Sequence, residues 1–201
     1  MRPIRLGITG GIGSGKSVVA RVLQTLGIPV FDCDAESKQL TVVHPFIRRQ
    51  LVALVGTEVY QGNTLNKAYL ANYLFSSPEH VQQINGIIHP VLKDYFLQWV
   101  SKQSAKFVAI ESAILIEAGY DDVVDHVVMV SAPLEMRITR SVQRDGVPRS
   151  AIEKRIRQQM DDEKKRRCCQ FVIVNDGVTP VIPQVLEIIN TLLNKDFPFW
   201  K

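Results

Sequence analysis

The chain contains a full G-x-x-x-x-G-K-[ST] motif, Gly10 to Ser17, which begins where the apolar run Ile4 to Thr9 ends. Glycines without a Cβ let successive backbone N–H groups point inward around a polyphosphate, and the following helix adds its positive N-terminal end. Lys16 then reaches the β- and γ-phosphates, and the Ser17 hydroxyl reaches a Mg²⁺ ion. The motif predicts a nucleotide phosphate site formed by Gly11, Ile12, Gly13, Ser14, Gly15, Lys16, Ser17 and Val18.

The residues on both sides of the motif have the pattern that such a loop requires. The run before it is typical of a buried strand, and the segment after it keeps helical spacing until Gly27 and Pro29 stop it. The apolar positions of this helix are Val18, Val19, Val22, Leu23 and Leu26. An ordinary glycine-rich turn is the alternative, but the order strand, loop, helix favours the phosphate site.

A strongly basic stretch runs from Pro133 to Gln170. It holds eleven of the chain's 24 lysines and arginines, namely Arg137, Arg140, Arg144, Arg149, Lys154, Arg155, Arg157, Lys164, Lys165, Arg166 and Arg167. A solvated helical face is one interpretation. A nucleic-acid surface is another, although the stretch has no aromatic residue for base stacking. With a phosphate loop in the same chain, we favour a lid that closes cations over a transferring phosphoryl group, and expect no nucleic-acid partner.

The composition is that of a soluble globular protein. The 201 residues are 46% hydrophobic and 22% charged, with a net charge of +4. No apolar stretch approaches the roughly 18 residues of a membrane span, and Met1 to Pro3 run into a strand rather than a signal peptide. Cys33, Cys168 and Cys169 are odd in number and lack C-x-x-C spacing. We therefore expect a cytoplasmic protein without a membrane segment.

Short apolar or β-branched runs alternate with segments of helical pattern. This alternation predicts an α/β fold with a five-stranded parallel sheet flanked by helices, which together with the phosphate loop gives a P-loop core. The expected strands are Ile4–Thr9, Pro29–Phe31, Phe107–Glu111, His126–Ser131 and Phe171–Asn175. A last amphipathic helix is expected over Pro183–Asn194.

Two interruptions of this alternation divide the chain. About 70 residues separate the second strand from the third, more than one crossover helix needs, which predicts an inserted helical lobe. The basic stretch is the second interruption. We therefore expect a nucleotide-binding core of residues 1–34, 106–136 and 171–201, a helical substrate lobe of residues 35–105, and a basic helical lid of residues 137–170.

The chain lacks the signature of a guanine-recognising switch. The expected N-K-x-D signal is absent, because Asn66 and Lys67 are followed by Ala68 and Tyr69. Large motor ATPases need a longer chain. A phosphate loop, an inserted lobe and a basic lid in a short chain fit a kinase that acts on a small molecule.

Further segments resemble one family. The sequence reads L-G-I-T-G-G-I-G-S-G-K-S over residues 6–17, G-I-P-V-F-D-C-D over 27–34 and I-N-G-I-I-H-P over 84–90. Together with Arg140, Arg144–Asp145, Gln159 and Asn175–Gly177, these segments resemble the dephospho-CoA kinase family over nearly the whole chain.

The chain departs from this family's pattern at several positions. The D-x-P-L-L-F-E segment appears as E-S-A-I-L-I-E over residues 111–117, which keeps the final Glu117 but replaces the aspartate by Glu111. Val18 replaces a threonine after the phosphate motif, Cys169–Gln170 replaces A-D, and Lys67 stands where arginine is common. These departures concern the placement of the substrate more than the phosphate chemistry.

The resemblance implies ATP-dependent phosphorylation of the ribose 3′-hydroxyl of dephospho-CoA, the final step of coenzyme A biosynthesis, with residues 35–105 as the CoA lobe. A ribose hydroxyl is a poor nucleophile, so a base should orient it and accept its proton. Asp34 is the candidate, because it lies just beyond the end of the second strand. A helix N-cap is its alternative role. Asp32 is the second candidate base, a structural partner or a substrate contact.

Two glutamates lie at the end of the third expected strand and six residues beyond it. Glu111 ends an apolar run, as does the acidic residue that holds Mg²⁺ through water in related nucleotide-binding proteins. An exposed strand-end carboxylate is the alternative. Glu117 is expected to orient the substrate or the lid rather than to bind metal.

Two arginines of the basic stretch are candidates for the transferring phosphoryl group. Arg140 and Arg144 are four residues apart and therefore share one face of a helix. Their planar guanidinium groups bind phosphate oxygens in pairs. We expect both to stabilise the charge that spreads over the phosphoryl group during transfer.

Two further segments carry binding predictions from the resemblance. Asn175 and Gly177 follow the last strand, where related kinases hold adenine with backbone groups, although an ordinary turn explains the same residues. His89 lies in the inserted lobe near the expected acceptor, and a structural role is its alternative.

Two other functions stay open. A nucleoside or nucleoside-monophosphate kinase shares the core and the lid but lacks the Asp32/Asp34, His89–Pro90 and Arg140-to-Gln159 set. A nucleotide-binding regulator that closes on ATP without transfer would retain Lys16 and Ser17 but tolerate the loss of the Asp34 carboxylate. A monomer or a small homo-oligomer is expected.

Overall fold

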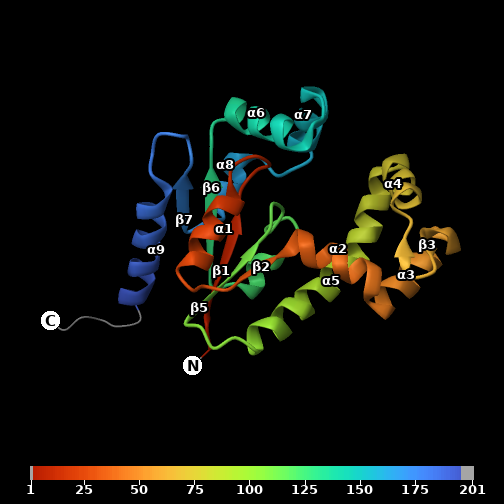
Figure 1. Ribbon diagram of the computed structural model, residues 1–201, viewed down its shortest axis with the longest axis horizontal. Coiled ribbons are helices and arrows are strands. Elements are labelled where there is room, and N and C mark those ends of the chain that lie inside the picture. Colours follow the sequence, from red (N-terminus) through yellow and green to blue (C-terminus); the bar gives the residue numbers. More distant parts are fainter. Residues whose placement is uncertain (1, 196–201) are drawn as a thin grey trace. The chain divides into compact units, whose positions relative to one another are not determined.

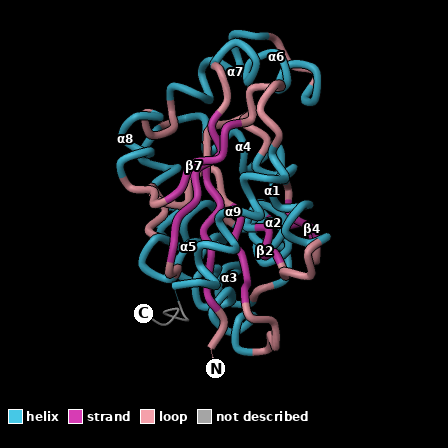
Figure 2. The backbone as a smooth tube through the Cα atoms, turned by 90° about the vertical axis from the view of Figure 1, so that its left-hand side faces the viewer, coloured by secondary structure: helices cyan, strands magenta, loops and turns pink. Residues whose placement is uncertain are grey.

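Five strands form a parallel sheet in the order β2-β5-β1-β6-β7, as seen in the computed structural model, which describes residues 2–195 (Figures 1 and 2). The prediction of a five-stranded parallel sheet flanked by helices is confirmed. The strands are β1 (Ile4–Thr9), β2 (Val30–Asp32), β5 (Phe107–Glu111), β6 (His126–Ser131) and β7 (Phe171–Val174). Their ends agree with the predicted ends to within one residue.

Strand β1 lies at the centre of the sheet. It pairs in parallel with β5 on one side, with Ile8 opposite Glu111, and with β6 on the other, with Thr9 opposite Met129. Strand β6 pairs in turn with β7. Because these strands are parallel, the loops that follow β1, β5, β6 and β7 leave from the same edge of the sheet. Ligands of open α/β sheets bind at this edge, where the strand order reverses.

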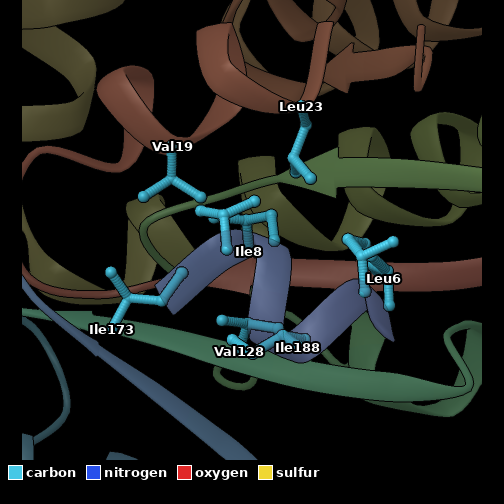
Figure 3. A pocket seen from close by; sticks show the side chains of 9 residues that line it. Leu6, Ile8, Val19, Leu23, Val128, Ile173 and Ile188 are labelled. Carbon is cyan, nitrogen blue, oxygen red and sulfur yellow. The ribbon is translucent and has the colours of Figure 1, made fainter. Parts of the chain in front are cut away.

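One face of the sheet is covered by helices α1 (Lys16–Thr25) and α9 (Val181–Lys195), which pack together. Figure 3 shows side chains from β1, β6, β7 and both helices pointing toward one another around a small cavity. The cavity holds about 10 Å³ and is lined only by apolar side chains. A space of this size and polarity belongs to a dry core rather than to a ligand site. The core residues at its centre are Leu6, Ile8, Val19, Leu23, Val128, Ile173, Val185 and Ile188.

The opposite face of β1 is covered by the segment that follows β5. This segment ends in a short 3₁₀ helix, η2 (Tyr120–Val123). A Cβ on Gly7 would lie 2.8 Å from the Cδ1 atom of Leu115 and 3.2 Å from the Cγ2 atom of Val124. The absence of a side chain at Gly7 therefore lets this segment approach the sheet closely.

The chain divides into two compact units. One contains residues 1–31 and 103–201, and the other contains residues 32–102. Residues 196–201, which the sequence assigns to the nucleotide-binding core, lie outside the described residues. The basic stretch belongs to the first unit and forms α6 (Leu134–Asp145), α7 (Arg149–Arg157) and α8 (Asp162–Arg167). Figure 1 shows α6 and α7 beyond the end of β6, at the edge where the phosphate loop begins.

The second unit is mainly helical. It contains α2 (Cys33–Val43), α3 (Pro45–Val55), η1 (Thr57–Val59), α4 (Lys67–Ser76) and α5 (Pro78–Ser101). The sequence pattern missed one feature, a hairpin of two short strands, β3 (Tyr60–Gln61) and β4 (Thr64–Leu65). The longest helix, α5, continues through Pro90, which cannot donate a backbone hydrogen bond. Among the described residues, no helix combines the length and the apolar character that a membrane crossing requires.

Candidate active site

The phosphate loop has the predicted order of strand, loop and helix. Strand β1 ends at Thr9, and α1 begins at Lys16, with Gly15 as its N-cap residue at φ 93°. The Ser14 N–H donates to the carbonyl oxygen of Gly11 at 3.1 Å. The Nζ atom of Lys16 lies 3.4 Å from the same carbonyl oxygen, so its side chain folds back over the loop.

Two glycines of the loop are required by both conformation and space. Gly13 has a φ of 77°, and a Cβ there would lie 2.2 Å from the carbonyl oxygen of Arg137. At Gly15, a Cβ would lie 2.1 Å from the Nδ2 atom of Asn175. Residues with a side chain rarely adopt such positive φ values, and these distances are far below van der Waals contact. The loop is thus packed directly against α6 and against the segment after β7.

Asn175 connects the loop to α6. Its Nδ2 atom donates to the carbonyl oxygen of Ser14 at 2.8 Å, and its own carbonyl oxygen accepts from the Arg140 guanidinium at 3.1 Å. Three residues that the sequence singled out are therefore neighbours. The prediction that Asn175 and Gly177 hold adenine stays a prediction, but the Asn175 side chain has a definite structural role in fixing the loop.

The turn after Asn175 is organised by Asp176. One oxygen of its carboxylate accepts from the backbone N–H groups of Val178 and Thr179 at 3.0 and 2.8 Å. These hydrogen bonds hold the pKa of the Asp176 carboxyl below its usual value, although desolvation opposes them. Hydrogen bonds from an aspartate to the backbone two and three residues further on are typical of a turn. The turn and the predicted nucleotide contact therefore occupy the same segment.

Sequence reasoning missed Arg137, which is 3% exposed and lies beside the loop. Its Nε atom donates to the carbonyl oxygen of Ile12 at 3.0 Å, and its guanidinium also pairs with Asp162. The Ile12 N–H in turn donates to the Gln159 side chain at 2.9 Å. In the sequence, Arg137 is one of eleven cations of the basic stretch. No neighbouring residue marks it as buried, because the carboxylate that pairs with it lies 25 residues away.

Arg144 occupies a different environment from Arg140. Its Nε atom lies 2.7 Å from a carboxylate oxygen of Asp145, which also pairs with Arg155. The Arg144 side chain is 64% exposed. The hydrogen bond from Arg144 is the main reason that the pKa of Asp145 lies below its usual value, and the Arg155 charge adds to it.

Glu117 joins the segment after β5 to the basic stretch. Its Oε1 atom accepts from the Met160 N–H at 2.9 Å and also pairs with Lys165. Of the two roles expected for Glu117, these contacts support a role in ordering the lid.

Ser17, the last residue of the phosphate motif, and Glu111, at the end of the strand beside β1, carry oxygen atoms of the kind that bind Mg²⁺. Ser17 is exposed in the first turn of α1, and Glu111 is the last residue of β5, opposite Ile8 in the central strand. Mg²⁺ prefers oxygen ligands and is usually held by one or two protein groups together with substrate phosphates. In the described residues, no group of three or more His, Cys, Asp or Glu side chains forms a dedicated metal site. A hydroxyl and a carboxylate beside a phosphate loop therefore fit a nucleotide-bound ion.

The second unit carries Asp32, Asp34 and His89. The Asp32 carboxylate caps α2, because its Oδ1 atom accepts from the N–H groups of Asp34 and Ala35 at 2.9 and 3.0 Å. The alternative role of Asp34 as the helix N-cap is therefore wrong, and its carboxylate is exposed in the first turn. His89 lies half-buried on α5, and burial lowers the pKa of its imidazole.

Comparison with known proteins identifies the family. The family model described as dephospho-CoA kinase matches residues 4–180. Dephospho-CoA kinase from Bacteroides fragilis is 53% identical over 193 residues, covering 96% of this chain and 94% of that protein. The enzyme of the same name from Porphyromonas gingivalis is 40% identical, with 96% of both chains covered.

A solved structure agrees with this result. A crystal structure of a Thermus thermophilus protein superimposes with a TM-score of 0.81 at 32% identity, covering 97% of this chain and 98% of that one. The family model alone spans far more than half of the residues. The chain therefore belongs to the dephospho-CoA kinase family, whose members phosphorylate dephospho-CoA.

Proposed function

We propose that this protein transfers the γ-phosphoryl group of ATP to the ribose 3′-hydroxyl of dephospho-CoA, giving CoA and ADP. The observation that carries the proposal is the phosphate loop from Gly10 to Ser17, held between α6 and Asn175, in a chain of the dephospho-CoA kinase family. ATP is the expected donor because this motif encloses a nucleotide polyphosphate.

The donor side is assigned to the loop and its flanking residues. The loop from Gly11 to Val18 encloses the phosphates with backbone N–H groups, and Lys16 reaches the β- and γ-phosphates. The N–H groups of Ile12, Ser14 and Val18 instead donate within the protein and hold the loop in shape. The Ser17 hydroxyl would hold Mg²⁺ directly, and Glu111 would hold it through water. When bound, Mg²⁺ supplies positive charge that offsets the negative charge of the phosphate oxygens. Asn175 and Gly177 are assigned to the adenosine end of the nucleotide.

The acceptor side is assigned to the second unit. Asp34 is the base that orients the 3′-hydroxyl and accepts its proton as the oxygen bonds to phosphorus. Its exposed carboxylate supports this role, since Asp32 already caps the helix. We place Asp32 and His89 among the substrate contacts. Glu117 is assigned to the substrate side through the lid that it orders.

The cations of α6 are assigned to the transferring group. The Arg140 guanidinium donates to the Asn175 carbonyl oxygen beside the loop, whereas the Arg144 side chain is 64% exposed. We therefore place Arg140 nearer to the γ-phosphate than Arg144. Both guanidinium groups would stabilise charge that develops on the phosphoryl oxygens. Once the γ-phosphate is present, Arg144 would exchange its contact with Asp145 for it.

The setting of the enzyme is also a proposal. Cys33, Cys168 and Cys169 are all free thiols, as is usual in a reducing compartment. We infer a cytoplasmic enzyme that works as a monomer or a small homo-oligomer, with dephospho-CoA as its small-molecule partner.

Product analysis tests the proposal. ADP release is measured with ATP, Mg²⁺ and either dephospho-CoA, adenosine or AMP, and phosphorus NMR locates the new phosphate. Turnover with dephospho-CoA and a 3′-phosphate product are expected. Turnover with AMP alone would instead favour a nucleoside-monophosphate kinase, and ATP binding without transfer to any of the three would favour a regulator.

A further inference from the structure

The peptide groups of Ile12 are held on both sides by the basic stretch. The Ile12 N–H donates to the Oε1 atom of Gln159 at 2.9 Å, and the Ile12 carbonyl oxygen accepts from the Nε atom of Arg137 at 3.0 Å. Arg137 comes from α6, and Gln159 from the connection between α7 and α8. Two separate segments of the basic stretch therefore fix one residue of the phosphate loop.

Arg137 is built into this position. It is 3% exposed, and a Cβ on Gly11 would lie 1.8 Å from one of its terminal guanidinium nitrogens. The guanidinium thus lies where a side chain at position 11 would otherwise be. Its other terminal nitrogen pairs with Asp162, the first residue of α8. One side chain therefore connects the phosphate loop, α6 and α8.

The glycines of the loop explain why such support is needed. Gly11 and Gly13 flank Ile12, and glycine has the largest backbone freedom of all residues. A loop of this composition must lose that freedom before its N–H groups can converge on phosphate. External hydrogen bonds to both sides of Ile12 reduce this cost in advance, which is how preorganisation improves binding.

We infer that Arg137 is a positioning residue for the nucleotide polyphosphate, which acts by holding the Ile12 carbonyl while Asp162 holds its guanidinium. The inference rests on the proposed binding of ATP at this loop. It differs from the roles assigned to Arg140 and Arg144, because Arg137 acts on the loop rather than on the phosphoryl group. It predicts a selective effect on ligands that carry phosphates.

Arg137→Met provides the main test, because methionine keeps an unbranched side chain but has no donor. The measurements are KM for ATP, KM for dephospho-CoA, and inhibition constants for ADP and adenosine as competitors of ATP. We expect KM for ATP and Ki for ADP to rise about tenfold or more, the size of one lost hydrogen bond from a charged group. Ki for adenosine, which has no phosphate, should stay within about twofold, because none of its contacts is expected to depend on the Ile12 carbonyl.

Arg5→Met is the matched control. Arg5 is also a largely buried arginine paired with a carboxylate, Asp125, but it lies at the start of β1, away from the loop. Its loss should lower the melting temperature and leave the ratio of the two inhibition constants unchanged. Arg137→Lys should restore only part of the ADP affinity, because an ammonium group cannot reproduce the planar fork of arginine.

Asp162→Asn keeps the proposal testable if Arg137→Met fails to fold. The Asp162 side chain is 46% exposed, so its replacement perturbs packing less. We expect a rise of about threefold in Ki for ADP without a change for adenosine, the size of one weakened charge-assisted hydrogen bond. Equal changes for ADP and adenosine, or an unchanged Ki for ADP in a folded variant, would overturn the inference.

The two proposals fail separately. If the wild-type protein does not phosphorylate dephospho-CoA but equilibrium titration shows that Arg137→Met weakens ADP binding and not adenosine binding, the positioning role holds and the proposed function is wrong. If dephospho-CoA is phosphorylated and Arg137→Met leaves ADP binding unchanged, only the positioning role is wrong.

Discussion

The Nζ atom of Lys165 lies 3.0 Å from the Oε1 atom of Glu117, and Lys165 is fully buried. The same ammonium group donates to the carbonyl oxygen of Ala113 at 2.7 Å, and the Glu117 oxygen also accepts from the Met160 N–H at 2.9 Å. A charged pair thus joins the segment after β5 to α8. A buried ammonium group needs such partners, because desolvation strongly disfavours an isolated charge.

Loss of the Glu117 carboxylate should therefore destabilise the fold. We expect Glu117→Ala to lower the free energy of unfolding by about 3 kcal/mol or more, because it leaves the buried Lys165 ammonium group without its counter-ion and without the oxygen that accepts its hydrogen bond. Urea denaturation measures this change. Glu117→Gln is the matched control, since its amide oxygen still accepts from Lys165 and Met160, and it should cost less than half as much. Equal losses for the two variants would contradict this account.

Arg140 should matter for the chemical step. We expect Arg140→Ala to slow turnover by ~10³ or more, the scale of arginines that stabilise charge on a transferring phosphoryl group. Steady-state kinetics at saturating ATP measures this effect, with Arg21→Ala, an exposed cation on α1, as the control. A loss of under tenfold would remove Arg140 from the site. Because Arg140 also contacts Asn175, circular dichroism should establish that the variant is folded.

Asp34 separates catalysis from nucleotide binding. We expect Asp34→Asn to leave ATP affinity within about threefold while kcat falls by about 10² or more, since a lost base affects only the transition state. Equilibrium titration with ATP and single-turnover kinetics measure the two quantities. Unchanged turnover would exclude Asp34 as the base and favour a non-catalytic nucleotide-binding protein.

The neighbouring Asp32 provides a contrast. Asp32→Ala removes the N-cap of α2 and should lower the free energy of unfolding by about 1 kcal/mol. The two aspartates are separated by one residue, yet their replacement should affect different quantities. If Asp32→Ala reduces kcat as much as Asp34→Asn does, the assignment of the base to Asp34 alone is wrong.

The strands were predictable because their signal is local. Phe107 to Ile110 and Val127 to Val130 are continuous apolar runs, as expected for strands buried on both faces, and β5 and β6 start and end at the predicted residues. The β3–β4 hairpin was missed because strands of two residues have no periodicity to detect. Its turn residues, Gly62 and Asn63, were the available signal.

The site was predictable only where the chemistry lies within a motif. Gly10 to Ser17 defines the loop through its own composition. The cap role of Asp32 and the burial of Arg137 could not be read in this way. Asp32 and Asp34 are chemically identical, and backbone geometry decides which of them accepts from the first N–H groups of α2. The burial of Arg137 depends on Asp162, which the fold brings close.

The Asp125 carboxylate should make the stability of the fold depend on pH. Its carboxylate accepts from the Arg5 backbone N–H at 2.8 Å and from the Arg5 guanidinium at 3.0 Å. Burial raises the pKa of Asp125, but the hydrogen bonds from Arg5 and the charges of Arg5 and Arg2 outweigh it and hold the pKa below its usual value. The folded state therefore binds a proton at Asp125 less readily than the unfolded chain.

A depressed carboxyl pKa contributes stability that is present above the unfolded value, about 3.9, and is lost as the pH falls through the folded value. We expect Asp125→Asn to lower the free energy of unfolding by about 1–3 kcal/mol at pH 7, the cost of weakening charged hydrogen bonds. The gap between wild type and variant should narrow as the pH falls below about 4. Urea denaturation across this range measures it, with Asp121→Asn as the exposed control. A gap that is independent of pH would show that packing, rather than the ionised carboxylate, accounts for the loss.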